Sequence, residues 1–394
     1  MFDCQPVRRW NLSPTLRNKS MYWRKPFECD KLSGERLVKA NAPMKAHELL
    51  IHLGHHKTGT TTLQKMLTQS REALMKEGIL FPDLYPYSGN GIILGYHLLD
   101  DKTDDAVRAN WLKVTPAQAQ QLSRSEWSKI VRTIQEKQPK TLLLSSESYF
   151  KLIRKDTMQQ FDQLTNDVAQ TKTAIAYLRA PDNYFLSVIQ QRLKKVRPIQ
   201  AISRTRIRDT IEPLYEGWSG DVNLHIFDRS TLCDGDIVTD FVSKHLPSLD
   251  QSQITCPKGI ANAIMSAEAM SLLYDCNRGC LNQNIAPQVL IDQILKADRK
   301  VLHPTKLKLS RDWAEVLINW SVPDLFWLRD TKNITFPNID YDAIKMELNA
   351  TDPVEFERVE QFCEVNPDRK AALYARAEKR AKLPDTIRRW LSNW

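Results

Sequence analysis

Residues 48–64 decide how this chain folds, and their sequence is E-L-L-I-H-L-G-H-H-K-T-G-T-T-T-L-Q. It opens with a short apolar run over 49–53, crosses a loop that ends at Gly59, and continues into a threonine-rich segment with apolar residues at helical spacing. This order predicts a strand, a tight loop and the first turns of a helix. Backbone N–H groups at a helix start have no intrahelical acceptor, and the helix dipole places positive charge there. The stretch therefore predicts a site for a phosphate or sulfate group.

The side chains of the loop strengthen that prediction. Lys57 contributes a full positive charge, and hydroxyl donors come from Thr58, Thr60, Thr61 and Thr62. The pattern differs from the nucleoside-triphosphatase loop G-x-x-x-x-G-K-[ST], in which the lysine directly follows the second glycine. Here Thr60 follows Gly59, and the lysine stands two places before that glycine. An ordinary strand–helix turn with a surface lysine is the alternative interpretation of this stretch alone.

Strands and helices alternate along the next two hundred residues. Buried strands are predicted at 79–81, 141–144, 173–178 and 222–227, with helices at 60–76, 111–138, from 181 onward and at 237–245. Residues 83–110 have the composition of a polar loop, and from 261 onward the periodicity is almost entirely helical. The alternation predicts an α/β fold with a parallel sheet flanked by helices, followed by a mostly helical C-terminal part.

Composition sets the domain organisation and the class of partner. We predict a basic, weakly ordered extension over 1–46, an α/β domain over 47–255 and a helical region over 256–394 that packs on the core. The net charge of +9 and the pI of about 9.1 favour an anionic partner. The seven cysteines form no C-x-x-C pair, which predicts reduced thiols and a cytoplasmic location, with a single disulfide as the alternative. No apolar run is long enough to predict a transmembrane segment.

A second anion site is predicted at the end of the strand over 173–178. Arg179 ends that strand, and Ser187 follows eight residues later on the next helix. Ligands of open parallel sheets bind beyond the carboxyl ends of the strands, so both residues are expected beside the 55–59 loop. An arginine fork and a serine hydroxyl can hold a phosphate there. Two anion sites on one sheet edge suggest a nucleotide that is phosphorylated at both ends.

Both motifs resemble those of a known enzyme family. K-T-G-T-T at 57–61 looks like the 5′-phosphosulfate loop of the P-loop sulfotransferases, and Y-L-R-A-P-D-N-Y-F-L-S at 177–187 is similar to their 3′-phosphate motif. The resemblance is to the bacterial branch and covers roughly residues 47 to 250. It implies a P-loop NTPase-like fold and 3′-phosphoadenosine 5′-phosphosulfate (PAPS) as co-substrate, with no metal. The residues that it assigns to PAPS are His55, His56, Lys57, Thr58, Gly59, Thr60, Thr61, Thr62, Arg179 and Ser187.

Sulfuryl transfer is an in-line displacement in which positioning and charge stabilisation dominate. Lys57 would neutralise charge on the oxygen that bridges to the leaving phosphate. Two residues compete for the role of general base toward the acceptor hydroxyl: Glu147 at a strand end, and His97 in the polar loop.

The expected acceptor is a hydroxyl-bearing molecule, in first place a carbohydrate, and not a nucleic acid. Peripheral contact with a membrane stays open for the basic C-terminus. A P-loop kinase that uses ATP, or a nucleotide- or glycan-binding module without turnover, are the alternative functions.

Overall fold

The computed structural model describes the residues 44–55, 57–84, 89–98, 115–147, 149–194, 207–254, 265–300, 304–344 and 357–390. All of them belong to one compact unit that begins at Pro43. Nearly all of the extension predicted over 1–46 lies outside the described residues, and so does His56.

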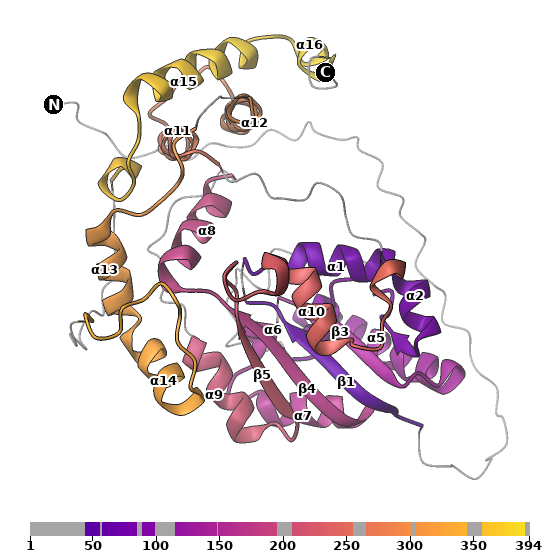
Figure 1. Cartoon of the computed structure of the whole chain (residues 1–394). Coiled ribbons are helices and arrows are strands. Elements are labelled where there is room, and N and C mark those ends of the chain that lie inside the picture. The colour runs from indigo at the N-terminus through magenta and orange to yellow at the C-terminus, as the bar shows by residue number, and fades with distance from the viewer. Residues whose placement is uncertain are drawn as a thin grey trace. The chain divides into compact units, whose positions relative to one another are not determined.

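Five parallel strands form the single sheet that these residues contain. They are β1 (Ala46–Leu53), β2 (Ile79–Leu80), β3 (Thr141–Ser146), β4 (Ala169–Leu178) and β5 (Asp221–Ile226), in the spatial order β2-β3-β1-β4-β5 (Figure 1). Leu53, the last residue of β1, is paired with Ser146 of β3 and Ala176 of β4. The carboxyl ends of three strands therefore lie side by side, and the predicted α/β fold with a parallel sheet flanked by helices is confirmed.

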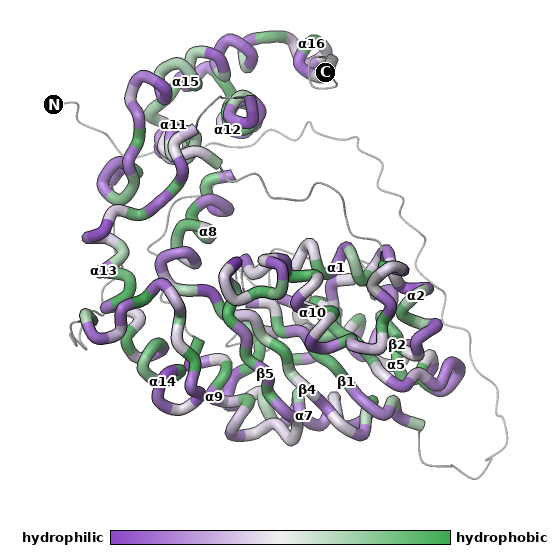
Figure 2. Tube along the Cα trace, viewed as in Figure 1, coloured by the Kyte–Doolittle hydropathy of each residue, from purple (hydrophilic) through white to green (hydrophobic). Residues whose placement is uncertain are grey.

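Helices cover both faces of the sheet because alternate strand residues on both faces are apolar. Leu50, Leu143 and Ile175 pack beneath α1 (Thr60–Gln69), α2 (Arg71–Lys76) and α10 (Ile237–His245). Leu49, Leu142 and Ala174 face the opposite layer, which contains α5 (Pro116–Lys137), α7 (Met158–Asn166) and α9 (Ile207–Gly217). Figure 2 shows the hydrophobic stretches of the strands β1 and β4 between these layers. A sheet buried on both faces is typical of parallel strands.

After α10 the described residues contain α-helices, short 3₁₀ turns and one isolated bridge, between Leu309 and Cys363. The helices are α11 (Ala267–Asn277), α12 (Pro287–Asp298), α13 (Arg311–Trp320), α14 (Val322–Lys332), α15 (Pro367–Ala381) and α16 (Asp385–Trp390). A second core joins most of them to Phe185, Ile189 and Leu193 of α8 (Pro181–Leu193). No helix in the described part of the chain is both long and apolar enough to cross a bilayer.

Three local predictions need correction. The helix expected over 60–76 is divided at Ser70 into α1 and α2, and β4 begins at Ala169, earlier than the predicted 173. The prediction of a polar loop over 83–110 is wrong for the stretch of α3 (Ile92–Gly95) and the 3₁₀ turn η1 (Tyr96–Leu98). There Ile92, Ile93 and Leu94 are buried in the core, and that burial stabilises a short helix that periodicity over four residues cannot reveal.

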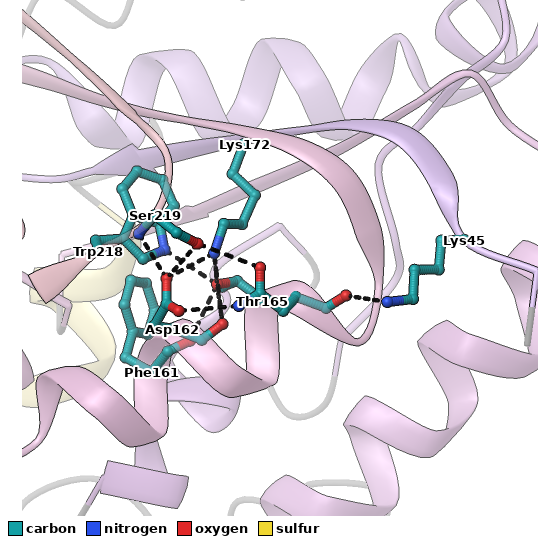
Figure 3. A network of polar contacts seen from close by, with 8 residues as sticks. Lys45, Phe161, Asp162, Thr165, Lys172, Trp218 and Ser219 are labelled. Atoms are coloured by element: carbon teal, nitrogen blue, oxygen red, sulfur yellow. Dashed lines mark hydrogen bonds and ion pairs between the residues drawn. The ribbon is translucent and has the colours of Figure 1, made fainter.

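A buried ion pair braces the end of the sheet at which β4 begins (Figure 3). Lys172 Nζ lies 2.7 Å from Asp162 Oδ1 and 3.2 Å from Thr165 Oγ1, and the Lys172 side chain is only 2% exposed. The ammonium also lies 5.2 Å from the ring centroid of Trp218. Burial raises the pKa of Asp162, but hydrogen bonds from Lys172 and Ser219 outweigh burial and hold that pKa below its ordinary value. The pair links α7 to β4 and to the turn before β5.

Replacement of Asp162 by Ala should lower the free energy of unfolding by about 3–5 kcal/mol, because it leaves a buried ammonium without its carboxylate. Urea denaturation measures the change. The control is Glu216→Ala, since Glu216 pairs with Lys155 at 3.4 Å and both side chains are exposed. That variant should change stability by less than about 1 kcal/mol. Equal effects of the two substitutions would contradict the importance of the buried pair.

Candidate functional site

Two hydrogen bonds help to hold the loop between β1 and α1, one to the backbone of β3 and one within the loop. The N–H of Gly54 donates to the carbonyl of Ser146 over 3.0 Å, and Thr58 Oγ1 donates to the carbonyl of His55 over 2.8 Å. Lys57 and Gly59 adopt left-handed φ values of 69° and 77°. A non-glycine residue in that region costs about 1–3 kcal/mol, and such strain concentrates at functional sites. The loop thus turns sharply into the first turn of α1.

Two glycines permit this turn. A Cβ on Gly54 would lie 2.8 Å from Cγ and 2.9 Å from Cα of Glu147, closer than real side chains approach one another. A Cβ on Gly59 would lie 2.9 Å from Cγ2 of Ile237, the first residue of α10. The loop therefore lies in close contact with the end of β3 on one side and with the start of α10 on the other.

The threonines of the loop differ in burial and in hydrogen bonding. The hydroxyl of Thr58 is already used within the loop, where it donates to the His55 carbonyl. Thr60 is buried, and its hydroxyl has no hydrogen-bond partner among the residues that the structure describes. Thr61 is exposed and Thr62 is half-buried. Buried polar groups are nearly always satisfied, so this hydroxyl is available to a water molecule or a ligand.

Arg179 faces the lysine-bearing turn. Its Nη1 donates to the carbonyl of Lys57 over 2.6 Å and lies 3.5 Å from Ser187 Oγ. The guanidinium carbon lies 5.6 Å from the ring centroid of Phe227, the residue that follows β5. Burial lowers the pKa of Arg179, while the carboxylates of Asp182 and Asp228 act in the opposite direction. The structure thus brings Arg179 and Ser187 together with the loop at one edge of the sheet.

His55 is placed inside the protein rather than at its surface. Its ring is 1% exposed and stacks on the ring of Tyr184, with centroids 4.8 Å apart and planes 9° from parallel. The ring of Phe150 contacts it at the same centroid distance of 4.8 Å. The assignment of His55 to the cofactor stays a prediction, and its neighbour His56 lies outside the described residues.

The two candidate bases occupy different surroundings. Glu147 directly follows β3, is half-buried, and packs against Gly54 at the edge of the sheet. His97 lies in η1, which packs on α5. Burial lowers the pKa of His97, and Arg124 acts in the same direction. Within the described residues no group of three or more His, Cys, Asp or Glu side chains could hold a metal ion.

Sequence reasoning missed several residues of this edge: Gly54, Tyr184, Phe227 and the carboxylates Asp182 and Asp228. Phe227 and Asp228 follow β5 directly, so the strand-end rule that found Arg179 could have found them too. The side chain of Asp182 has one buried oxygen without a hydrogen-bond partner among described residues, and burial raises its pKa. Nothing in the local sequence pattern indicates the contact between Tyr184 and His55, because 129 positions separate the two residues.

Comparison with known proteins adds little to this picture. No family model and no curated protein sequence matches the chain. One solved structure that is similar is described as that of a "putative kinase" from Chloroflexus aurantiacus j-10-fl, at 1.70 Å resolution. It is 15% identical, covers 52% of this chain and 100% of its own, and has a TM-score of 0.29. The fold class therefore stands on the strand pairing itself.

His52 lies beneath the loop and has a strongly altered acidity. It is 0% exposed on β1, its Nδ1 lies 2.9 Å from Ser145 Oγ, and its ring is edge-on to the ring of Phe241. Burial lowers the pKa of His52 from 6.5 to about 4, although the Glu147 carboxylate acts to raise it. The folded protein therefore keeps this imidazole neutral where the unfolded chain binds a proton.

Stability should consequently fall as the pH drops from about 6.5 to about 4, with His52 contributing about 3 kcal/mol of the loss. Urea denaturation between pH 7 and pH 4 measures this slope. His52→Gln should make the slope shallower, whereas His47→Gln, at an exposed position of the same strand, should not change it. Identical slopes for the wild type and His52→Gln would contradict the assignment.

Proposed function

We propose that the chain is a sulfotransferase that transfers a sulfuryl group from PAPS to a hydroxyl, in first place on a carbohydrate. The observation that carries the proposal is the 2.6 Å hydrogen bond from Arg179 to the Lys57 carbonyl. It joins two anion-binding elements, the loop and the strand-end arginine, at one edge of the sheet. A nucleotide with phosphates at both ends suits such a pair, and the resemblance of both motifs supports the same donor.

Each residue then has a role at a stated group. The loop amides, Thr60 and Thr61 hold the 5′-phosphate, while Arg179 and Ser187 hold the 3′-phosphate. The Lys57 ammonium neutralises the charge that develops as the bond from sulfur to the bridging oxygen breaks. The acceptor oxygen forms the new bond to sulfur and gives its proton to a carboxylate, for which the candidate is Glu147, packed against Gly54 of the loop. A cytoplasmic location belongs to the same proposal; the described cysteines are Cys233, Cys276, Cys280 and Cys363, all free thiols.

Isothermal titration calorimetry should detect binding of adenosine 3′,5′-bisphosphate, with equal affinity in Mg²⁺ and in EDTA. Arg179→Ala and Lys57→Ala should each weaken binding by about 10- to 100-fold, because a hydrogen bond to a charged group contributes about 1.5–3 kcal/mol. Lys65→Ala is the control, since Lys65 is an exposed lysine on α1. Tight binding of ATP that requires Mg²⁺, without binding of the bisphosphate, would favour a kinase instead.

Transfer of label from [³⁵S]PAPS to a panel of polysaccharides should depend on Glu147. Glu147→Gln removes the proton acceptor at the sheet edge and should slow turnover by about 10²- to 10⁴-fold, with little change in bisphosphate affinity. His97→Gln is the matched comparison, because His97 is the competing candidate and changes to the same side chain. Loss of turnover in His97→Gln alone would transfer the role of base to His97. Bisphosphate binding without transfer to any acceptor would favour a binding module.

A further inference from the structure

Three aromatic side chains meet at the loop, and each comes from an element beyond a different strand. His55 belongs to the loop after β1, Phe150 to α6 (Tyr149–Leu152) after β3, and Tyr184 to α8 after β4. The His55 ring contacts both of the others, with centroid distances of 4.8 Å to each. The stack on Tyr184 is nearly parallel at 9°, and His55 is 1% exposed. The three rings therefore fix the loop against the elements that leave the two neighbouring strands.

The backbone of His55 transmits this restraint to the anion-binding residues. Its carbonyl accepts the hydrogen bond of Thr58 Oγ1 over 2.8 Å, so the residue whose ring is stacked is also linked directly to Thr58. Thr58 stands between Lys57 and Gly59, the two residues with left-handed φ. A strained turn keeps its shape only where its surroundings hold it. The contacts that hold this turn include the stack on one side and the Arg179–Lys57 hydrogen bond on the other.

Tyr184 lies on the helix of the other anion site. It stands between Arg179 and Ser187 in the sequence, and its N–H donates to the carbonyl of Ala180 over 2.8 Å in the first turn of α8. By place in the chain it would belong to the site of the 3′-phosphate. Its ring, however, stacks on a residue of the loop.

We propose that Tyr184 is a positioning residue for the 5′-phosphate: although it belongs to the 3′-phosphate helix, it acts through the His55 ring on the loop. This inference rests on the proposed function and adds a residue to it. It makes the loop dependent on α8, so that the two phosphate sites form one unit. The face of the Tyr184 ring makes this contact, and the role does not require the hydroxyl group.

Calorimetric titration with three nucleotides separates the two phosphates. The ratio of the Kd of adenosine 3′-monophosphate to that of adenosine 3′,5′-bisphosphate measures the contribution of the 5′-phosphate. The ratio for adenosine 5′-monophosphate measures that of the 3′-phosphate in the same way. Tyr184→Leu should lower the 5′-phosphate ratio by about three- to tenfold, the range expected for loss of an aromatic stack. The 3′-phosphate ratio should change by less than about twofold.

Tyr184→Phe keeps the ring and should retain the wild-type ratios. Gln191→Ala changes an exposed position two turns further along the same helix and serves as control. Tyr184→Met, which fills the space without a flat ring, replaces Tyr184→Leu should that variant fail to fold. A selective fall in the 3′-phosphate ratio, or unchanged ratios in Tyr184→Leu, would overturn the role of Tyr184. The proposed function would still be supported if the wild type binds the bisphosphate. Absence of bisphosphate binding in the wild type would overturn both.

Discussion

The pairing of β1 with β3 on one edge and with β4 on the other is the constraint on which the candidate site depends. Parallel pairing in this register places Leu53 and Ser146, the last residues of β1 and β3, level with Ala176, two residues before the end of β4. The segments that directly follow the three strands therefore lie at the same edge of the sheet: the loop after β1, Glu147 after β3 and Arg179 after β4. A shift of register by one residue would turn every side chain of a strand to the opposite face, where it would meet a different helix layer.

Charge at this edge is balanced rather than simply positive. Lys57 and Arg179 are the cations, but Asp182 and Asp228 act on the guanidinium, and Glu147 stands beside Gly54. Burial lowers the pKa of Arg179 and raises that of Asp182, because it disfavours the charged form of each. A partner of opposite charge would stabilise the charged arginine, and a proton would neutralise the carboxylate. An incoming phosphate would favour the charged arginine and disfavour the charged form of Asp182. The acidic neighbours therefore limit how strongly the site attracts anions and make its charge responsive to what it binds.

The sequence was sufficient to predict the parts of the fold that depend on short patterns. Four of the five strands contain an apolar run, and β5 alternates polar and apolar residues. The strand-end rule correctly placed Arg179 near a loop more than a hundred residues earlier in the chain. The short helix over 92–95 could not be predicted, because burial by distant residues stabilises it. The division at Ser70 was missed as well, since helical spacing of apolar residues continues across the break.

Side-chain roles at the site were harder to predict than positions, and His55 and Thr58 show why. Their residue types suit an anion, yet the structure packs the His55 ring against two aromatic rings and uses the Thr58 hydroxyl to close the turn. Both roles depend on contacts made across long stretches of sequence or on a backbone conformation that no pattern specifies. A loop with strained residues needs such internal supports, and the side chains nearest the ligand are the ones available to provide them. Part of a motif of this kind therefore maintains the shape of the loop, and in the proposed function Lys57, Thr60 and the backbone amides are left to contact the phosphate.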